Sequence, residues 1–317
     1  MIFPHLQGRE RLLRPLGFTG FQAEWITLVC LHSGLFTRDQ AQAFLGTGRS
    51  TARDFVHALL AARVSRRPVA SAATTDGRHI CRIFGKAIYR ALGLINVRHR
   101  RESSIEVTRR RLLSLDFVLD HPDLTWLATE PEKVACFQQL GIDPALLPKR
   151  IYTGRANGRV RYFHIKMPLA VEPERAVFTY IDPGMGTHSE LQSWGAAHSQ
   201  LWDKLRQTGR RIEVVAVAWE KHLLSRAERV LTSWRGRGIT EAEQEAIMLR
   251  QAIADTDWET LDRHGGIDAA AEKVIQAEEQ SASNNTPGMI DEFRLWRSSR
   301  CRRTGVPPSD LEGDIEG

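Results

Sequence analysis

The stretch FTRDQAQAFLGTGRSTARDFVHALLAARV, residues 36–64, decides the predicted fold of the amino-terminal part. Thr37 is a predicted N-cap, and Gln40 stands three residues later, where a capping box needs it, so a helix begins here. A glycine-containing turn at residues 46–48 separates this helix from the next one, for which Ser50 is the predicted N-cap. The apolar stripe predicted for that next helix consists of Ala52, Phe55, Leu59, Leu60 and Ala62.

A further helix is predicted upstream, over residues 18–33. Gly34 follows it and can end it in a left-handed conformation. Three helices with a glycine-containing turn between the last two are typical of a helix-turn-helix. The apolar residues of the upstream helix recur at helical spacing and predict one buried stripe, made of Phe21, Trp25, Leu28, Val29 and Cys30.

The residues after the third helix have the pattern of a β-hairpin. An extended stretch begins at Val64, the dipeptide at residues 76–77 is Asp-Gly, a turn signal, and apolar and polar residues alternate over residues 78–85. A hairpin directly after the third helix is typical of a winged helix. We therefore expect a winged helix-turn-helix domain over residues 1–104, with one more short helix at residues 86–94.

Charge is distributed unevenly along the 317-residue chain. Residues 1–120 carry 19 Lys and Arg against 9 Asp and Glu, whereas the remaining residues carry 25 against 29. A basic part joined to a mildly acidic one indicates that the amino-terminal part binds a polyanion. A solvated basic surface without a partner is the alternative.

The third helix of a helix-turn-helix enters the major groove of DNA, led by its amino-terminal residues. Arginine can bind guanine or phosphate there, and serine and threonine can bind either bases or phosphate. The predicted contacts of this helix are Arg49, Ser50, Thr51, Arg53 and His57. The predicted phosphate contacts of the wing and of the segment after residue 94 are Arg66, Arg67, Arg78, His79, Arg98, Arg100 and Arg101. For the cluster Arg109, Arg110 and Arg111, nucleic-acid binding and salt bridges to the acidic second part both stay open.

Residues 105–237 predict an α/β domain with a small mixed sheet. The runs at residues 159–167 and 175–182 are rich in β-forming residues and predict a hairpin. The strongly apolar run at 211–219 predicts a central strand that is buried on both faces. The other predicted elements are a helix at 105–120 linking the two domains, a strand at 124–127, a helix capped by Thr129 and Glu132, and helices at 189–207 and 222–234.

The remaining residues, 238–317, predict an acidic helical segment and a flexible tail. A capped helix is expected to start at Thr240, and residues 280–288 are rich in linker-forming residues. Residues 289–303 form a short amphipathic basic segment by sequence. The fold class that we expect for the whole chain is α+β.

Several classes of protein lack support in the sequence. The sequence contains no run of 18 apolar residues, so no transmembrane helix is predicted. The amino terminus has no apolar core of the kind that a signal peptide needs. The cysteines are scattered and contain no CxxC pair, so neither a zinc site nor a disulfide framework is predicted. No glycine-rich phosphate loop is present. We therefore expect a cytoplasmic protein without a metal or other cofactor.

The segment Asp182-Pro183-Gly184, at the end of a predicted strand, is the candidate for catalysis. Metal-dependent nucleases of the acid-x-lysine type need an acid and a lysine two residues apart on one strand. The run at residues 178–182 has no such pair, and Tyr180 stands where the acid would be needed. Asp182 is expected to shape the turn by accepting backbone N–H groups, and no catalytic residue is predicted.

The layout of FTRDQAQAFL, then STARDFVHALL, then the predicted wing resembles the replication-relaxation family of plasmids and conjugative elements. YIDPGMGT, residues 180–187, before a long helix resembles the second domain of that family. The resemblance covers roughly residues 20–235. It implies an amino-terminal winged helix, a degenerate domain related to restriction-endonuclease folds, and a bacterial accessory or regulatory protein of a mobile genetic element.

The sequence thus predicts a sequence-selective double-stranded DNA-binding protein that acts in transcription regulation, replication or transfer of a mobile genetic element. A homodimer is an open possibility for its assembly, and no membrane partner is expected. The alternative function is a metal-dependent DNA nuclease that uses Asp182 of the second domain.

Overall fold

The computed structural model describes residues 3–6, 8–62, 64–66, 80–95, 103–152, 159–184, 188–235, 245–246, 248–250, 252–253, 257–284 and 288–300. The chain divides into two compact units, one of residues 1–231 with 292–317 and one of residues 232–291. Helices and small sheets are combined in one chain, which confirms the α+β class. The predicted domain boundaries after residues 104 and 237 stay predictions.

The centre of the amino-terminal part of the first unit is helix α1 (Gly20–His32). Every residue from Trp25 to His32 is buried, whereas Phe21 is 58% exposed. The prediction of a single buried stripe was therefore wrong, because other elements surround this helix. Gly34, with a φ of 73°, turns the chain after it, as predicted. The short helices η1 (Pro4–Leu6) and η2 (Arg9–Leu16) precede α1 and contact it.

Helices α2 (Arg38–Leu45) and α3 (Arg49–Ala61) follow and pack against each other. The predicted capping box is present: Gln40 N donates to Thr37 Oγ1 and Thr37 N donates to Gln40 Oε1. Helix α3 begins earlier than predicted, because Gly48 is the N-cap and its carbonyl accepts from Ala52 N. Ser50 is thus an exposed residue of the first turn. The buried stripe consists of Ala52, Val56 and Leu59, and not of Phe55 and Leu60.

Three short strands form an antiparallel sheet beside these helices: β1 (Leu35–Phe36), β2 (Ser65–Arg66) and β3 (Cys81–Ile83). Their order is β1-β3-β2. Strand β2 pairs with β3 as the predicted hairpin requires, with Arg66 opposite Arg82. The sequence did not predict β1. The turn signal at residues 76–77 lies outside the described residues.

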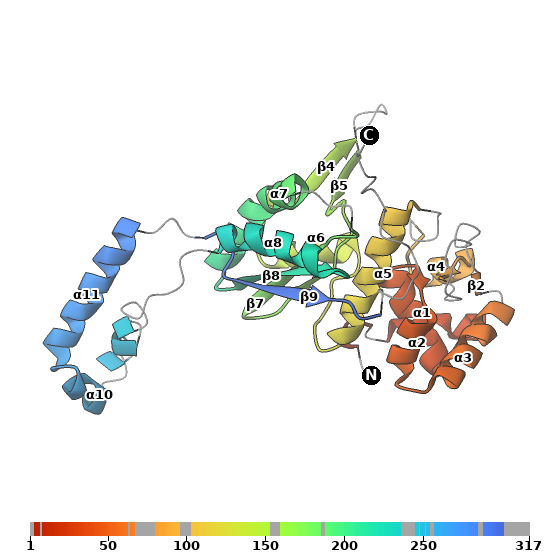
Figure 1. Cartoon of the computed structure of the whole chain (residues 1–317), viewed down its shortest axis with the longest axis horizontal. Coiled ribbons are helices and arrows are strands. Elements are labelled where there is room, and N and C mark those ends of the chain that lie inside the picture. Colours follow the sequence, from red (N-terminus) through yellow and green to blue (C-terminus); the bar gives the residue numbers. More distant parts are fainter. Residues whose placement is uncertain are drawn as a thin grey trace, which may run out of the picture. The chain divides into compact units, whose positions relative to one another are not determined.

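Helix α5 (Ile105–Asp120) joins the small helices to a larger sheet. Residues 112–119 of α5 are all buried. The helix contacts α1, α2 and β1, and it also contacts two strands of the larger sheet, β7 and β8 (Figure 1). Its position supports the predicted linking role. The short helix α4 (Lys86–Ala91) precedes it and starts as predicted, but it ends before Gly93 and thus earlier than residue 94.

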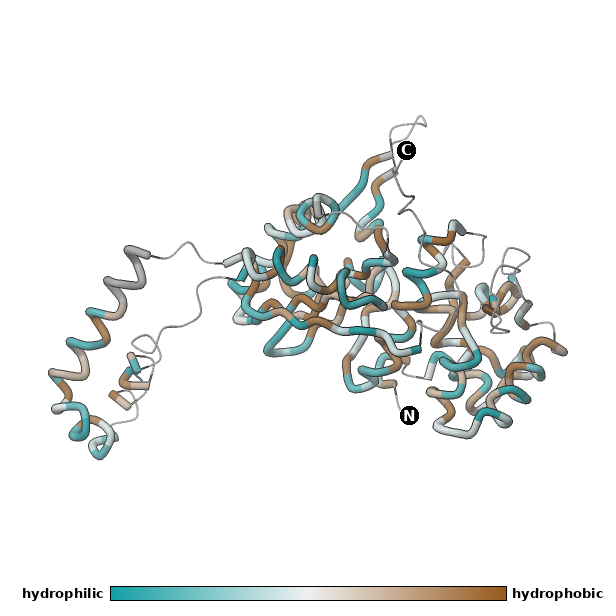
Figure 2. The backbone as a smooth tube through the Cα atoms, viewed as in Figure 1, coloured by the Kyte–Doolittle hydropathy of each residue, from teal (hydrophilic) through white to brown (hydrophobic). Residues whose placement is uncertain are grey.

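The larger sheet has the order β6-β7-β8-β9. Its strands are β6 (Leu169–Val171), β7 (Arg175–Ile181), β8 (Arg211–Ala218) and β9 (Glu292–Arg297). Strand β6 is antiparallel to β7, whereas β7, β8 and β9 are parallel. Strand β8 is central and almost entirely buried, as predicted, and hydrophobic residues are concentrated in this sheet (Figure 2).

The pairing of the strands differs from the prediction in three places. Strand β7 pairs with β6, and not with the preceding run, whose strand β5 (Arg159–Tyr162) pairs instead with β4 (Lys149–Tyr152). The predicted strand at 124–127 is a single bridge between Trp126 and Ala170. The basic segment at 289–303 contains β9, which the sequence did not predict.

Three helices complete the larger-sheet part: α6 (Glu130–Gln139), α7 (His188–Gln207) and α8 (Lys221–Trp234). The capping box of Thr129 and Glu132 starts α6, as predicted. From α7, Trp202 packs against Phe178 of β7. The short helix η5 (Pro144–Leu146) leads from α6 to β4.

The second unit contains α10 (Trp258–Arg263) and α11 (Ile267–Asn284). Leu249, Leu261 and Ala270 are the most deeply buried residues of its small core. Most of the helix predicted from Thr240 lies outside the described residues. Helix α11 reaches Asn284, so the first part of the predicted linker at 280–288 is helical. None of the helices that the structure describes is long and apolar enough to cross a membrane.

Candidate nucleic-acid interface

The exposed side of α3 carries all five of the residues predicted to contact DNA from this helix. They are Arg49, Ser50, Thr51, Arg53 and His57, and each is exposed. Because Ala52, Val56 and Leu59 are buried, the helix is oriented by its apolar stripe. Its polar amino-terminal turns therefore face solvent, where a ligand can reach them.

Aromatic packing under α2 and α3 holds this surface in place. Phe44 of α2 stacks with Phe3 at 6.2 Å between ring centroids and lies 5.0 Å from Trp25 of α1. Trp25 also makes an edge contact with Phe36 of β1 at 5.4 Å. Large buried aromatic rings contribute much of the packing energy of small domains. The surface of α3 is thus presented by a well-packed support.

One ion pair lies on the exposed surface of α3. Arg53 Nε is 3.1 Å from Asp54 Oδ1, and the two side chains are 55% and 67% exposed. Exposed pairs of this kind contribute between 0 and about 1 kcal/mol. Arg53 can therefore leave Asp54 for a phosphate or a guanine at little cost.

The other predicted DNA contacts lie at the limits of the described chain. The backbone of Arg66 belongs to β2, and its side chain is not described. The remaining predicted contacts, Arg67, Arg78, His79, Arg98, Arg100 and Arg101, lie outside the described residues. Their contribution to binding stays a prediction.

The cluster at residues 109–111 has contacts within the protein. The Arg109 guanidinium lies over the Trp219 ring, 4.6 Å from its centroid, and Arg110 forms an ion pair with Glu106. Burial, with the nearby charge of Arg82, lowers the pKa of Arg111 to about 10. These contacts are internal, and the ion pair of Arg110 lies within α5 and not with the acidic second part, so binding of phosphate by the cluster stays a prediction.

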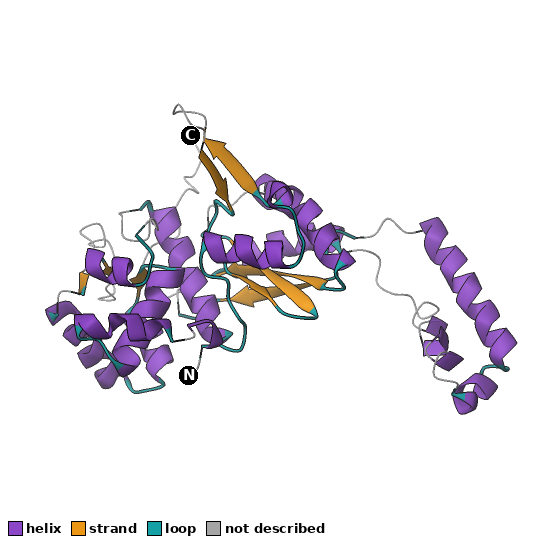
Figure 3. Cartoon of the chain, turned by 180° about the vertical axis from the view of Figure 1, so that it is seen from behind, coloured by secondary structure: helices purple, strands orange, loops and turns teal. Residues whose placement is uncertain are grey.

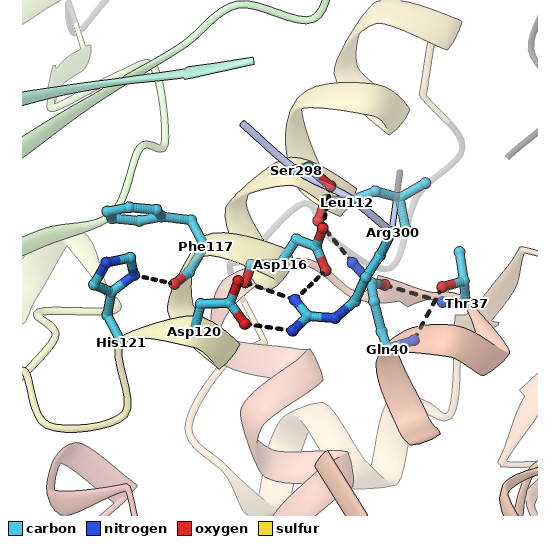
Figure 4. Close-up of polar contacts among 9 residues, drawn as sticks. All are labelled: Thr37, Gln40, Leu112, Asp116, Phe117, Asp120, His121, Ser298 and Arg300. Carbon is cyan, nitrogen blue, oxygen red and sulfur yellow. Dashed lines mark hydrogen bonds and ion pairs between the residues drawn. The ribbon is translucent and has the colours of Figure 1, made fainter. Parts of the chain in front are cut away.

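Helix α5 carries a polar connection from the capping box of α2 to the end of β9 (Figure 4). Gln40 Nε2 donates to the Leu112 carbonyl at 2.8 Å. One turn later, Asp116 accepts from Ser298 and from Arg300 Nη1, the latter at 3.0 Å. Arg300 also pairs with Asp120. The sequence did not predict this connection, because Ser298 and Arg300 follow a strand that it did not predict.

Asp116 is the buried centre of that connection. Its side chain is fully buried, and burial raises the pKa of its carboxyl group, while the positive charge of Arg300 acts in the opposite direction. Burial acts to lower the pKa of Arg300, but its bonds to Asp120 and Asp116 and their charges outweigh this effect and raise the pKa. The charge of Arg300 therefore stabilises a carboxylate that has no access to water.

At the carboxyl end of β7, Asp182 shapes a turn, as predicted. Its Oδ1 accepts from Gly184 N at 2.8 Å, and Gly184 has a φ of 96°. A Cβ atom at Gly184 would lie 3.3 Å from the Trp219 ring, so this position favours glycine. Tyr180 is buried, and its pKa is raised by burial and by the charges of Asp182 and Glu190.

At this strand end, the part of the chain that the structure describes holds no metal-binding cluster. Among the described residues, no group of three or more His, Cys, Asp or Glu side chains could hold a metal ion. His198 and Trp202 of α7, near this strand, are buried packing residues: the rings stack at 5.7 Å, and His198 Nδ1 bonds to the Trp194 carbonyl.

Comparison with known proteins gives no relative from which a function could be taken. No family model, no curated protein and no solved structure matches this chain.

Proposed function

We propose that the protein is a sequence-selective double-stranded DNA-binding protein in which α3 reads the major groove. The observation that carries this proposal is the exposure of Arg49, Ser50, Thr51, Arg53 and His57 on one helix whose opposite side is buried. An α-helix fits the major groove, and arginine can form paired bonds to guanine there.

The order of the elements around α3 supports a winged helix. A helix, a short strand, two helices and two further strands follow one another, and all three strands share one antiparallel sheet. In this arrangement β2 and β3 are the stems of the wing, and Arg66, Arg67, Arg78 and His79 contact phosphates on the flank of the groove. Phosphate contacts fix the position of the protein, and base contacts select the sequence.

The larger sheet serves in this proposal as a folded platform that is fixed to the DNA-binding part through α5. The resemblance to the replication-relaxation family assigns it to a degenerate nuclease-like fold. It also assigns the protein a regulatory or accessory role in a bacterial mobile genetic element, in transcription, replication or transfer. Self-association as a homodimer through the platform would place two α3 helices on neighbouring half-sites.

Selection of duplexes from a random library by the full-length protein tests this function. We expect enrichment of a defined site. Replacing Arg49 and Arg53 together with alanine should weaken binding to that site by about 1–3 kcal/mol for each of the two arginines that reads a base. A matched control, Lys204→Ala with Arg229→Ala, removes two positive charges from α7 and α8 and should keep the site preference. Unchanged preference and affinity in the α3 variant would contradict the assignment.

The alternative, a metal-dependent nuclease, receives no support from the position of Asp182, whose carboxylate is engaged in the turn with Gly184. Its test is incubation of the protein with supercoiled plasmid and magnesium or manganese. Cleavage that disappears in a folded Asp182→Ala variant would establish the nuclease and overturn the platform role.

A further inference from the structure

Strands β4 and β5 form a two-stranded antiparallel ribbon that belongs to neither of the other sheets. The ribbon projects beyond the larger sheet in both views (Figures 1 and 3). Its register places Arg150 opposite Arg161 and Ile151 opposite Val160. Successive residues of a strand point to opposite faces, so the two pairs lie on different faces of the ribbon.

The composition of the ribbon is unfavourable for a surface that meets only water. Arg150 and Arg161 place like charges directly opposite each other, which is destabilising, and the ion pair of Arg161 with Glu130 offsets part of this. On the other face, Ile151 is 58% exposed and Val160 is 39% exposed. Lys149, also exposed, lies on the same face as Ile151, so this face carries a positive charge as well. A polyanion with apolar groups between its charges would complement both faces.

The base of the ribbon is firmly attached to α6. Glu130 Oε2 is 2.9 Å from Arg161 Nη1, and Glu130 Oε1 accepts from Tyr162 N at 2.8 Å. Phe163 N donates to the Pro148 carbonyl at 2.7 Å and closes the end of the ribbon. A partner that binds the ribbon therefore meets a preorganised element, and little conformational entropy is lost on binding.

Lys149 and Arg150 can both reach a partner from this attached ribbon. One N–H of the Lys149 ammonium group bonds to the Ala145 carbonyl at 3.0 Å, and the group has three such donors. Arg150 is exposed on β4, the strand opposite the one that carries Arg161. Two positive charges thus lie on β4, opposite Tyr162 and Arg161, near the attached end of the ribbon.

We propose that the β4–β5 ribbon is a second DNA-binding element, which binds duplex DNA separately from α3. A two-stranded ribbon fits the major groove of B-form DNA, as an α-helix does. Lys149 and Arg150 contact phosphates, and Ile151 with Val160 contacts apolar base edges such as the thymine methyl group. This proposal rests on the proposed function, since it assigns a second surface to the same ligand.

The test uses the full-length protein and a fluorescent duplex that carries the selected site, with affinity measured as a function of salt concentration. The ribbon variant is Lys149→Gln with Arg150→Gln, which leaves Arg161 and its pair with Glu130 intact. The matched control is Lys204→Gln with Arg229→Gln, which removes the same net charge elsewhere. A charge-keeping variant, Lys149→Arg with Arg150→Lys, shows whether charge or residue identity is needed.

For each phosphate that the protein no longer neutralises, the slope of log affinity against log salt falls by about 0.9. We expect the ribbon variant to lose about 2 units of salt slope and to keep its site preference. The control and the charge-keeping variant should keep the salt slope of the natural protein. Circular dichroism tests whether each variant is folded. If the ribbon variant is not folded, Arg150→Gln alone is measured, and its salt slope should be reduced by about 1 unit.

Ile151→Ser with Val160→Ser tests the apolar face. We expect weaker binding at all salt concentrations with an unchanged slope, because no charge is removed. A ribbon variant that behaves as the control does would overturn the second element and leave the α3 assignment intact. The second DNA-binding element would also be overturned if the ribbon variant lost salt slope for single-stranded RNA but not for duplex DNA. A natural protein that binds no duplex would overturn the proposed function together with the ribbon.

Discussion

Replacement of Arg300 with alanine tests whether the return of the chain after β9 stabilises the first unit. Arg300 contacts Asp116, whose side chain is fully buried, and Asp120, which is partly exposed. Without Arg300, the Asp116 carboxylate keeps its bond to Ser298 but loses its countercharge in a site that already raises its pKa. Removal of one partner from a buried ion pair costs about 3–5 kcal/mol. Because the Arg300 side chain is 22% exposed and water can enter its place, we expect about 3 kcal/mol.

The destabilisation of this variant should depend on pH. An acid whose pKa is higher in the folded state than in the unfolded state destabilises the fold above that pKa and does so less when it is protonated. Loss of Arg300 raises the pKa of Asp116 further, so the variant should be most destabilised at pH 8 and less so at pH 5. Added to Arg300→Ala, the substitution Asp116→Asn should remove most of the penalty for burying a carboxylate without its countercharge. This double variant should therefore be more stable than the sum of the two single effects predicts.

Urea unfolding followed by tryptophan fluorescence measures the change, because Trp296 of β9 lies 5.3 Å from Phe117 of α5. Hydrogen exchange of the β9 amides should become about a hundredfold faster, which corresponds to roughly 3 kcal/mol at 1.36 kcal/mol for each factor of ten. Arg297→Ala, an exposed residue of the same strand, is the control. If Arg300→Ala and Arg297→Ala unfold at the same urea concentration and exchange β9 at the same rate, the reasoning is refuted.

Three further predictions concern other parts of the molecule. Replacing Arg98, Arg100 and Arg101 with alanine should lower affinity for all DNA sequences and reduce the salt slope, with the site preference kept; loss of preference at an unchanged slope would reverse their assigned role. Asp182→Ala should lower the free energy of unfolding by about 1–2 kcal/mol, measured by urea denaturation, because Gly184 N loses its acceptor; an unchanged midpoint would exclude the turn role. Burial lowers the pKa of His5 and of His198 to about 4, so both are neutral in the folded protein, and stability should fall as pH decreases from about 6.5 towards 4, since the unfolded chain binds these protons first. An unfolding free energy that is constant between pH 7 and pH 5 would contradict this.

Local signals in the sequence predicted local features of the fold. The capping boxes at Thr37 and Thr129 depend on residues three apart, and both helices begin where these residues place them. The strongly apolar run of β8 could be assigned to the centre of a sheet because few other positions accept it. The start of α3 was predicted two residues late because glycine at position 48 supplies an N-cap without a side-chain bond.

Features that depend on distant parts of the chain were not predicted. Strand β1 has two residues, which is too short for a periodic pattern. The pairings of β7 with β6 and of β5 with β4 join strands that are neighbours in the sequence, but composition shows only that each run favours strands and not which neighbour it pairs with. Strand β9 pairs with β8 from about 80 residues away, and its Arg294 forms an ion pair with the buried Glu213 of β8. Glu213 also pairs with Arg175 of β7, a run that the sequence did assign to a strand, so this glutamate alone could not indicate a further basic strand.

The same distant contacts determine how the candidate interface is supported. Gln40 Oε1 accepts from the N-cap of α2, and its Nε2 donates to Leu112 of α5, so a single side chain joins the helix beneath α3 to the helix that touches the larger sheet. One turn further along α5, Asp116 is fixed by residues that follow β9. A change that frees Arg300 therefore acts on α5 first and reaches α2 through Leu112. For this reason, the effect of Arg300→Ala on DNA affinity should be smaller than its effect on stability, since it leaves every exposed residue of α3 in place and alters only the support beneath them.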